Sequence, residues 1–170
     1  YRYGYYDCDG TQVLKEEYNQ IERLIEIKND VYLIVAKNGQ YGVYINNIKI
    51  INTQYQSIDY NSDLQIFIVE KTKLYGAFNL KGIEILPIEF SQLSVNGIYL
   101  YGTKNTEETQ ENKVYDVNGK SVNIPFDTVI NKTSNSKYFI ENEKGKYYVV
   151  DAEFKKLTQQ KYNFLEYAYD

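Results

Sequence analysis

A glycine, or a residue aligned with it, recurs along this chain at a nearly constant spacing. The aligned positions are 4, 42, 76, 113 and 148, and successive ones lie 38, 34, 37 and 35 residues apart. In every copy an aromatic residue follows 13 or 14 residues later, and an aliphatic residue follows the aromatic by three. Such a period is typical of repeat architectures, in which one unit cannot bury its apolar face alone and neighbouring units stack. The spacing predicts about five tandem repeats of 34–38 residues.

The repeat positions can be assigned along the whole chain. The clearest copy lies around Tyr75-Gly76, whereas Lys113 and Tyr148 replace the glycine in two degenerate copies. The predicted repeat boundaries lie near 1–32, 33–66, 67–101, 102–137 and 138–170, within a single domain. The recurring aromatic residues are Tyr18, Tyr55, Phe90, Phe126 and Tyr162, and the aliphatic residues after them are Ile21, Ile58, Leu93, Val129 and Leu165.

Each repeat has the pattern of β structure. Runs such as residues 66–69 are rich in β-branched and aromatic residues, and turn pairs such as Asn38-Gly39, Asn118-Gly119 and Lys144-Gly145 follow such runs. The pattern predicts a meander of three or four strands per repeat, in a propeller-like or an open superhelical array. The recurring glycine is expected to mark a bulge or a close approach of two backbones. A helix over residues 14–27 is the competing interpretation, because apolar residues have helical spacing there.

These features together resemble the WG-repeat family of bacterial β-repeat proteins. The resemblance rests on the aromatic-Gly pair, the short turn at residues 79–82, the Ile85-Leu86-Pro87 that follows it, and the later aromatic-x-x-aliphatic pattern. It covers nearly the whole chain, with tyrosine in place of the family's tryptophan. The resemblance implies an all-β repeat array with a non-enzymatic binding or scaffolding role, and it implies no particular ligand. The residues it assigns to the repeat framework are Tyr3, Gly4, Tyr41, Gly42, Tyr75, Gly76 and Tyr147.

Composition excludes several classes of function. The 170 residues carry a net charge of −4, which provides no basic footprint for nucleic acid. Histidine is absent and Cys8 is the only cysteine, so no histidine-based catalytic triad, histidine metal site, cysteine zinc site or intrachain disulfide is expected. No run of 18 apolar residues is present, so no membrane span is expected. Methionine is also absent, which suggests a processed or excised part of a longer bacterial protein; its compartment, cytoplasm or cell envelope, stays open.

Catalytic and metal-binding interpretations are weak. The segment Asp7-Cys8-Asp9-Gly10 resembles an acidic cation loop, but it lacks the further oxygen ligands that calcium needs, so it is expected to be the hairpin turn of its repeat. Cys8 aligns with Leu80 and Val117 and is expected to be a small core or turn residue. Carboxylate pairs such as Glu84 with Glu89 or Asp59 with Asp63 alternate with apolar residues, which favours a solvated strand face. No enzyme activity, cofactor or metal is predicted.

The segment 102–113 is the one irregularity in the repeat pattern. It replaces a short hairpin turn with a longer polar stretch that contains Lys104, Glu107, Glu108 and Glu111. Repeat proteins often carry binding insertions on one face, so this segment is a candidate contact for a partner with a basic surface. The alternative is a solvated connection without a binding role.

The tyrosines form a second group of candidates. Those at the recurring positions are expected to pack repeat on repeat, with a ladder of rings along a groove as the alternative. Tyr99, Tyr101, Tyr115 and Tyr167 lie off these positions and are expected to be exposed rings. The leading hypothesis is a non-catalytic module that binds a protein partner. The alternative is a polysaccharide-binding module of the cell envelope that uses exposed tyrosines as stacking platforms.

Overall fold

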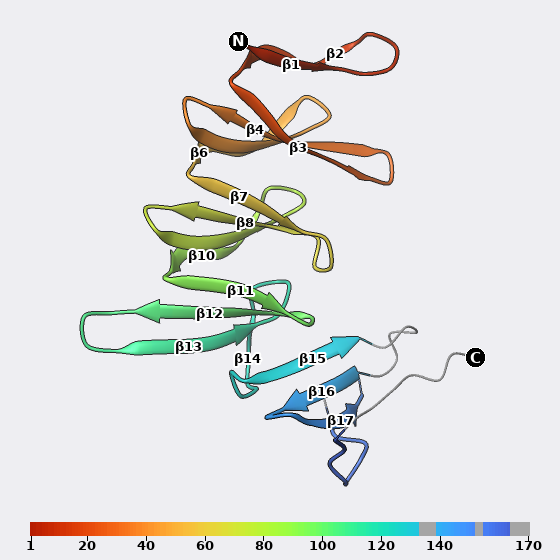
Figure 1. Cartoon of the computed structure of the whole chain (residues 1–170), viewed down its shortest axis with the longest axis vertical. Helices are drawn as coiled ribbons and strands as arrows, with labels where there is room; N and C mark the ends of the chain where they lie inside the picture. Colours follow the sequence, from red (N-terminus) through yellow and green to blue (C-terminus); the bar gives the residue numbers. More distant parts are fainter. Residues whose placement is uncertain (133–138, 152–154, 164–170) are drawn as a thin grey trace. The chain divides into compact units, whose positions relative to one another are not determined.

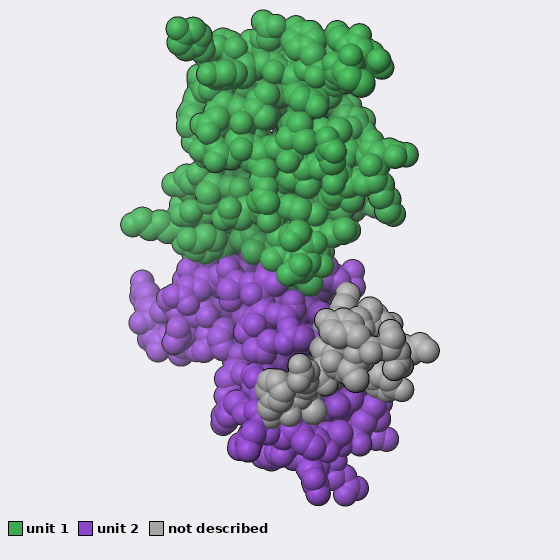
Figure 2. Space-filling view, turned by 45° about the vertical axis from the view of Figure 1, so that its right-hand side comes forward, with its two compact units in different colours: residues 1–89 green, residues 90–170 purple. Residues whose placement is uncertain are grey.

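The computed structural model describes residues 1–132, 139–151 and 155–163. The described residues form antiparallel β structure with no helix, as the repeat pattern predicted (Figure 1). They divide into two compact units, residues 1–89 and 90–170, coloured separately in Figure 2. Within the described residues, no helix has the length and apolar character that crossing a membrane requires.

Unit 1 contains three successive sheets. The first is the pair β1–β2, the second has the strand order β3-β4-β5-β6, and the third has the order β7-β8-β9-β10. Strands adjacent in a sheet are therefore adjacent in the chain, which is the topology of a meander. The strands are β1 (Tyr3–Tyr6), β2 (Gln12–Tyr18), β3 (Gln20–Ile27), β4 (Asp30–Lys37), β5 (Gln40–Ile45), β6 (Ile48–Tyr55), β7 (Ser57–Asn61), β8 (Ile66–Lys71), β9 (Leu74–Asn79) and β10 (Glu84–Phe90), whose last residue is assigned to unit 2.

Unit 2 contains two further sheets, with the orders β11-β12-β13-β14 and β15-β16-β17. Beyond β17, isolated bridges join Tyr147 to Tyr162 and Val150 to Lys156. The strands are β11 (Gln92–Asn96), β12 (Tyr99–Asn105), β13 (Gln110–Tyr115), β14 (Ser121–Val122), β15 (Thr128–Lys132), β16 (Phe139–Glu143) and β17 (Lys146–Val150).

At three of the four junctions a single residue joins the last strand of one sheet to the first strand of the next, whereas residues 123–127 join β14 to β15. Asn19 links β2 to β3, Gln56 links β6 to β7, and Ser91 links β10 to β11. Residues 14–27 accordingly form two strands rather than a helix. The sheets begin at Gln20, Ser57 and Gln92, whereas the boundaries drawn from the sequence, near 33, 67 and 102, cut through β4, β8 and β12. The observed sheets thus keep the period of the sequence pattern but begin one strand earlier.

The glycines at positions 4, 42 and 76 allow two backbones to approach closely, as the sequence pattern predicted. A Cβ atom on Gly42 would lie 2.8 Å from the carbonyl oxygen of Ile51, and one on Gly76 would lie 2.9 Å from that of Leu86. The register of β5 against β6 shifts at this point, as it does for β1 against β2. Where the glycine is lost, the following strand is short or missing: β14 has two residues, and no fourth strand pairs with β17 in the described part of its sheet.

The core is built on the recurring aromatic residues. Tyr18, Tyr55 and Phe90 each end the last strand of a sheet and are buried. Each ring packs edge-on against an aromatic ring of the next sheet, with centroids 5.5–5.9 Å apart. These partners are Tyr44, Phe78 and Tyr115, which all lie two residues after an aligned glycine position. Phe126 departs from this pattern, because it lies in the turn after β14 and packs against Tyr101.

In several hairpins the two strands are joined by a two-residue turn with left-handed backbone. Asn38-Gly39 and Lys144-Gly145 have positive φ at both residues, as expected for a type I′ turn, and so does Thr72-Lys73. The backbone N–H of Asn38 donates to Asn19 Oδ1 at 2.6 Å, and that of Thr72 donates to Gln56 Oε1. Asn19 and Gln56, which each link two sheets, therefore also hold the turn between the second and third strands of the sheet that follows.

Thr72-Lys73 is a poor sequence for its turn, because a β-branched residue is strained at positive φ. Replacing the pair with Asn-Gly, as in Thr72→Asn/Lys73→Gly, should stabilise unit 1 by about 1 kcal/mol. The backbone bond to Gln56 is retained. The reverse exchange, Asn38→Thr/Gly39→Lys, should destabilise unit 1 by a similar amount. Urea unfolding followed by circular dichroism measures both effects, and a loss of stability on the first exchange would contradict the strain argument.

Candidate functional site

The polar segment at residues 102–113 extends an ordered hairpin in unit 2. Strands β12 and β13 pair without interruption from Leu100↔Tyr115 to Asn105↔Gln110. The pairing of β11 with β12 stops at Gln92↔Thr103, so the outer part of the hairpin is a two-stranded ribbon. Figure 1 shows this ribbon projecting beyond the point where β11 begins. The longer polar stretch noted in the sequence is thus a regularly paired hairpin.

The tip of the ribbon, residues 106–109, is fixed by its two threonines. The backbone N–H of Thr106 donates to the carbonyl of Thr109 at 2.8 Å, and the N–H of Thr109 donates to Thr106 Oγ1 at 3.0 Å. The two hydroxyl oxygens lie 2.8 Å apart. Glu107 and Glu108 lie between these threonines and are exposed. The tip therefore presents two adjacent carboxylates on a preorganised turn.

The charged residues at the base of the ribbon are engaged within the hairpin. Lys113 Nζ lies 2.6 Å from Glu111 Oε1, and the hydrogen bond and charge of Lys113 lower the pKa of Glu111 below its ordinary value. Lys104 Nζ lies 4.9 Å from the centre of the Phe90 ring, a cation–π geometry. Of the four charged residues predicted to contact a partner, Glu107 and Glu108 are therefore those presented at the tip.

The expectation that Tyr99, Tyr101 and Tyr115 are exposed rings is wrong. Their side chains are 2%, 4% and 8% exposed. Tyr99 and Tyr101 belong to a core cluster with Val114, and Tyr115 packs against Phe90. The physical reason for Tyr99 and Tyr101 is that β12 is buried on both faces, and Tyr115, on β13, is buried by its contact with Phe90. A position off the repeat motif is therefore not by that fact a surface position. Tyr167, the fourth of this group, lies outside the described residues.

Among the recurring tyrosines, Tyr3 is 50% exposed, whereas Tyr41, Tyr75 and Tyr147 are half-buried. Tyr41 packs against the main core cluster of unit 1, in keeping with a structural role at that position. Sequence reasoning missed the second aromatic of each ring pair. Its signal was present, because Tyr44, Phe78 and Tyr115 align at one position of the repeat.

The acidic segment at residues 7–10 forms the turn between β1 and β2. Asp7 Oδ1 accepts hydrogen bonds from the backbone N–H groups of Asp9 and Thr11 at 3.0 and 2.8 Å. Asn79 and Asp116 make the same bonds in later turns. The interpretation as a hairpin turn is confirmed, and Cys8 is an exposed turn residue. No cluster of three or more histidine, cysteine or acidic residues suited to a metal ion occurs in the described part of the chain.

Tyr101 provides a pH-dependent contribution to stability. Its hydroxyl donates to the carbonyl of Thr128, and burial raises its pKa from 10 to about 12. Because the raised pKa favours the protonated folded state, this contribution is complete below about pH 10 and is lost as the pH rises towards 12. The loss is about 1.4 kcal/mol per pH unit in that range.

We expect Tyr101→Phe to cost about 1–2 kcal/mol at pH 7, because the Thr128 carbonyl loses its donor. The variant should also show a shallower loss of stability than the parent between pH 10 and 12. Denaturant unfolding at pH 7 and pH 11 measures both effects. Tyr3→Phe, at an exposed position, is the control and should match the parent at both pH values. An unchanged pH dependence in Tyr101→Phe would contradict the assignment.

Comparison with known proteins adds no assignment. No protein-family model matches the chain, and no curated protein sequence matches it. The resemblance to WG repeats therefore stays a prediction from the residues.

Proposed function

We propose that the chain is a non-catalytic protein-interaction module, built from WG-like β-repeats in a tandem array of about five meanders. Two observations support the array. The aligned positions fall at equivalent places in successive sheets. At each of the glycines 4, 42 and 76 the backbone lies so close to a carbonyl of the next strand that a Cβ atom would clash with it. In such arrays an element that departs from the common unit is a natural place for a specific contact.

The observation that carries the proposal is the β12–β13 ribbon. Its outer part leaves the sheet while keeping regular pairing, and its tip holds Glu107 and Glu108 in an exposed, hydrogen-bonded turn. A preorganised element loses little conformational entropy on binding. Two adjacent carboxylates complement a basic surface and speed its encounter with the chain. The partner is therefore a protein with a basic patch, and the interaction weakens as the salt concentration rises.

Affinity capture on immobilised protein tests the proposal with variants that leave the core unchanged. In the first variant, Glu107→Lys/Glu108→Lys reverses the charge of the tip. In the second, Asn-Gly replaces residues 105–110, which joins Lys104 to Glu111 in their observed register. The matched control is Glu26→Lys/Asp63→Lys, which reverses two exposed charges of unit 1.

We expect a protein with a basic surface to be retained by the parent and the control, and to be lost by both ribbon variants. Its affinity, measured by calorimetry with the purified partner, should fall at least tenfold on charge reversal. Equal retention by all four proteins would exclude the ribbon as the contact. Retention of the chain on wall polysaccharide, with no protein partner, would favour the carbohydrate alternative. Tyr99, Tyr101 and Tyr115 could not be its stacking platforms, because their rings are buried.

A further inference from the structure

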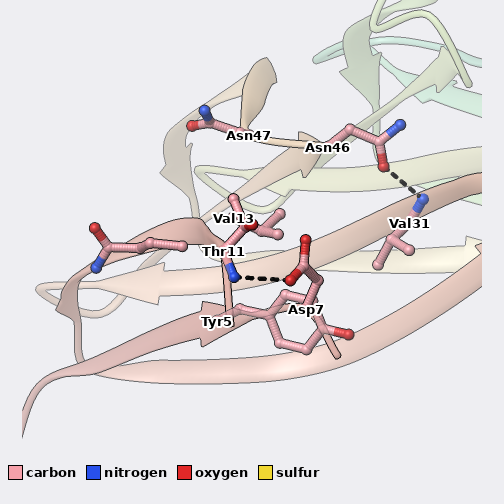
Figure 3. A pocket seen from close by; sticks show the side chains of 8 residues that line it. Tyr5, Asp7, Thr11, Val13, Val31, Asn46 and Asn47 are labelled. Carbon is pink, nitrogen blue, oxygen red and sulfur yellow. Dashed lines mark hydrogen bonds between the residues drawn. The ribbon is translucent and has the colours of Figure 1, made fainter. Parts of the chain in front are cut away.

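A pocket of about 400 Å³ lies in unit 1, between the β1–β2 hairpin and the sheet that follows it. This volume is within the range of small-molecule sites. In Figure 3, Tyr5, Asp7 and Thr11 of the hairpin lie below Asn46 and Asn47 of the next sheet. The remaining lining residues are Gln12, Val13 and Val31.

The pocket exists because one turn is shorter than its counterparts. In the sheet β7–β10 the N–H of Asn79 donates to the carbonyl of Ile83, which closes a three-residue loop whose Gly82 packs against the backbone of Ile50 in the preceding sheet. In the sheet β3–β6 the loop is only Asn46-Asn47, closed by the pair Ile45↔Ile48. The residue that would cover the preceding sheet is therefore missing. The position equivalent to Ile50 is Val13, which lines the pocket.

The polar groups at the pocket are partly free. Asn46 is engaged, since its Oδ1 accepts from the N–H of Val31 at 2.9 Å and its Nδ2 donates to Asp30 at 2.8 Å. Asp7 uses one carboxylate oxygen to hold its turn. Its second oxygen, the Asn47 carboxamide and the Tyr5 hydroxyl have no hydrogen-bond partner among the described residues. These groups supply both acceptors and donors to a ligand.

The charge and shape of the pocket restrict the ligand. The lining includes the carboxylate of Asp7 and no lysine or arginine, so it disfavours anions. Val13 and Val31 provide an apolar surface, and the ring of Tyr5 provides an aromatic one. Hydrogen-bonding groups beside an aromatic and aliphatic surface suit a ligand that has hydroxyl groups on its edge and C–H groups on its face.

We propose that this pocket binds a neutral pyranose, either as a free monosaccharide or as the terminal unit of a glycan. The site differs from the ribbon of unit 2 in position, in lining and in ligand class. The proposal for the pocket can therefore be refuted without affecting the proposal of a protein partner at the ribbon. It also differs from the tyrosine platforms predicted from the sequence, because Tyr5 was not among them.

Saturation-transfer NMR tests the proposal with the methyl glycosides of glucose, galactose, mannose and N-acetylglucosamine. The test variants are Asn47→Gly, which keeps the left-handed backbone while removing the carboxamide, and Asp7→Asn, which keeps the turn bond while removing the charge. The matched controls are Asn38→Gly, at another left-handed turn of the same sheet, and Asp116→Asn, at the equivalent turn of unit 2.

We expect at least one glycoside to bind, and its affinity to fall tenfold or more in each test variant and to stay within twofold of the parent in each control. Reducing-end-immobilised oligosaccharides of the same sugar then distinguish a terminal glycan unit from a free monosaccharide. No signal from any of the glycosides would overturn the proposal. Equal losses of glycoside affinity in the test and control variants would also overturn the proposal. Binding of lysine methyl ester in place of the sugars would overturn it too, because that result would indicate a cation site at Asp7.

Discussion

Gly76→Val should destabilise unit 1 by about 3 kcal/mol or more. The added Cβ would lie 2.8 Å from Ile88 Cγ1 and 2.9 Å from the carbonyl oxygen of Leu86. The side chain of Ile88 can turn aside, but the carbonyl belongs to β10 and can move only if the pairing of β9 with β10 is disturbed. Overpacking alone costs about 1–3 kcal/mol, and the two γ-methyl groups add to the clash.

Urea unfolding followed by far-ultraviolet circular dichroism measures the effect. Gly76→Ala should already be destabilising, because its Cβ is the atom that clashes. The matched control is Gly39→Asn, whose Cβ would meet nothing within 4 Å and whose φ of 76° asparagine tolerates. Because a side chain at this positive φ is strained, the control should cost about 1 kcal/mol, well below the loss expected for Gly76→Val. Similar unfolding midpoints for Gly76→Val and the parent would show that the backbones do not need their close approach.

The second large effect is expected at Phe90. This ring is 1% exposed, packs edge-on against Tyr115, and lies over Gly102, whose Cβ would come within 2.5 Å of the ring. Phe90→Ala removes the ring from a closed site and should cost about 3–5 kcal/mol. Phe126→Ala is the matched control, because Phe126 holds the aligned position of the next repeat but is 38% exposed. We expect the control to cost about 1–2 kcal/mol, because the ring is partly exposed but contacts Tyr101.

Gly102 provides a sharper test of the same contact. Gly102→Ala should be strongly destabilising beside Phe90 and much less so in the Phe90→Ala background, where the added Cβ keeps only the contact with Tyr115 at 3.2 Å. The double-mutant cycle should then give a coupling of at least about 1 kcal/mol. Independent, additive effects of the two substitutions would contradict the packing described for this ring.

Much of the fold follows from local patterns in the sequence. The β runs, the Asn38-Gly39 turn and the close approach at Gly42 and Gly76 depend on short-range chemistry and were predicted. The residue at which each sheet begins was not predicted, because a repeat of constant length has the same spacing from any starting residue. The strands β3, β7 and β11 each begin two residues after a buried aromatic residue, and only the strand pairing reveals this.

The candidate sites were harder to predict for a related reason. The run Ile98–Tyr101 is continuously apolar or aromatic, which is the pattern of a strand buried on both faces, and this signal outweighs the position of its tyrosines off the motif. Phe126 was expected to match Phe90, but β14 ends at Val122, so no strand carries Phe126 into a core. The pocket at Val13 depends on the absence of one turn residue, which a single sequence shows only after its turns are aligned.

The pairing of strands that are neighbours in the chain, with short links between sheets, also affects how the chain folds while it is being synthesised. In the described part, every strand pairs with strands next to it in the chain, so no sheet waits for a distant segment. Such local pairing favours fast folding, since little loop entropy is lost before contacts form. Each sheet can therefore close when its last strand leaves the ribosome, and the buried aromatic at its end then offers a surface on which the next sheet forms.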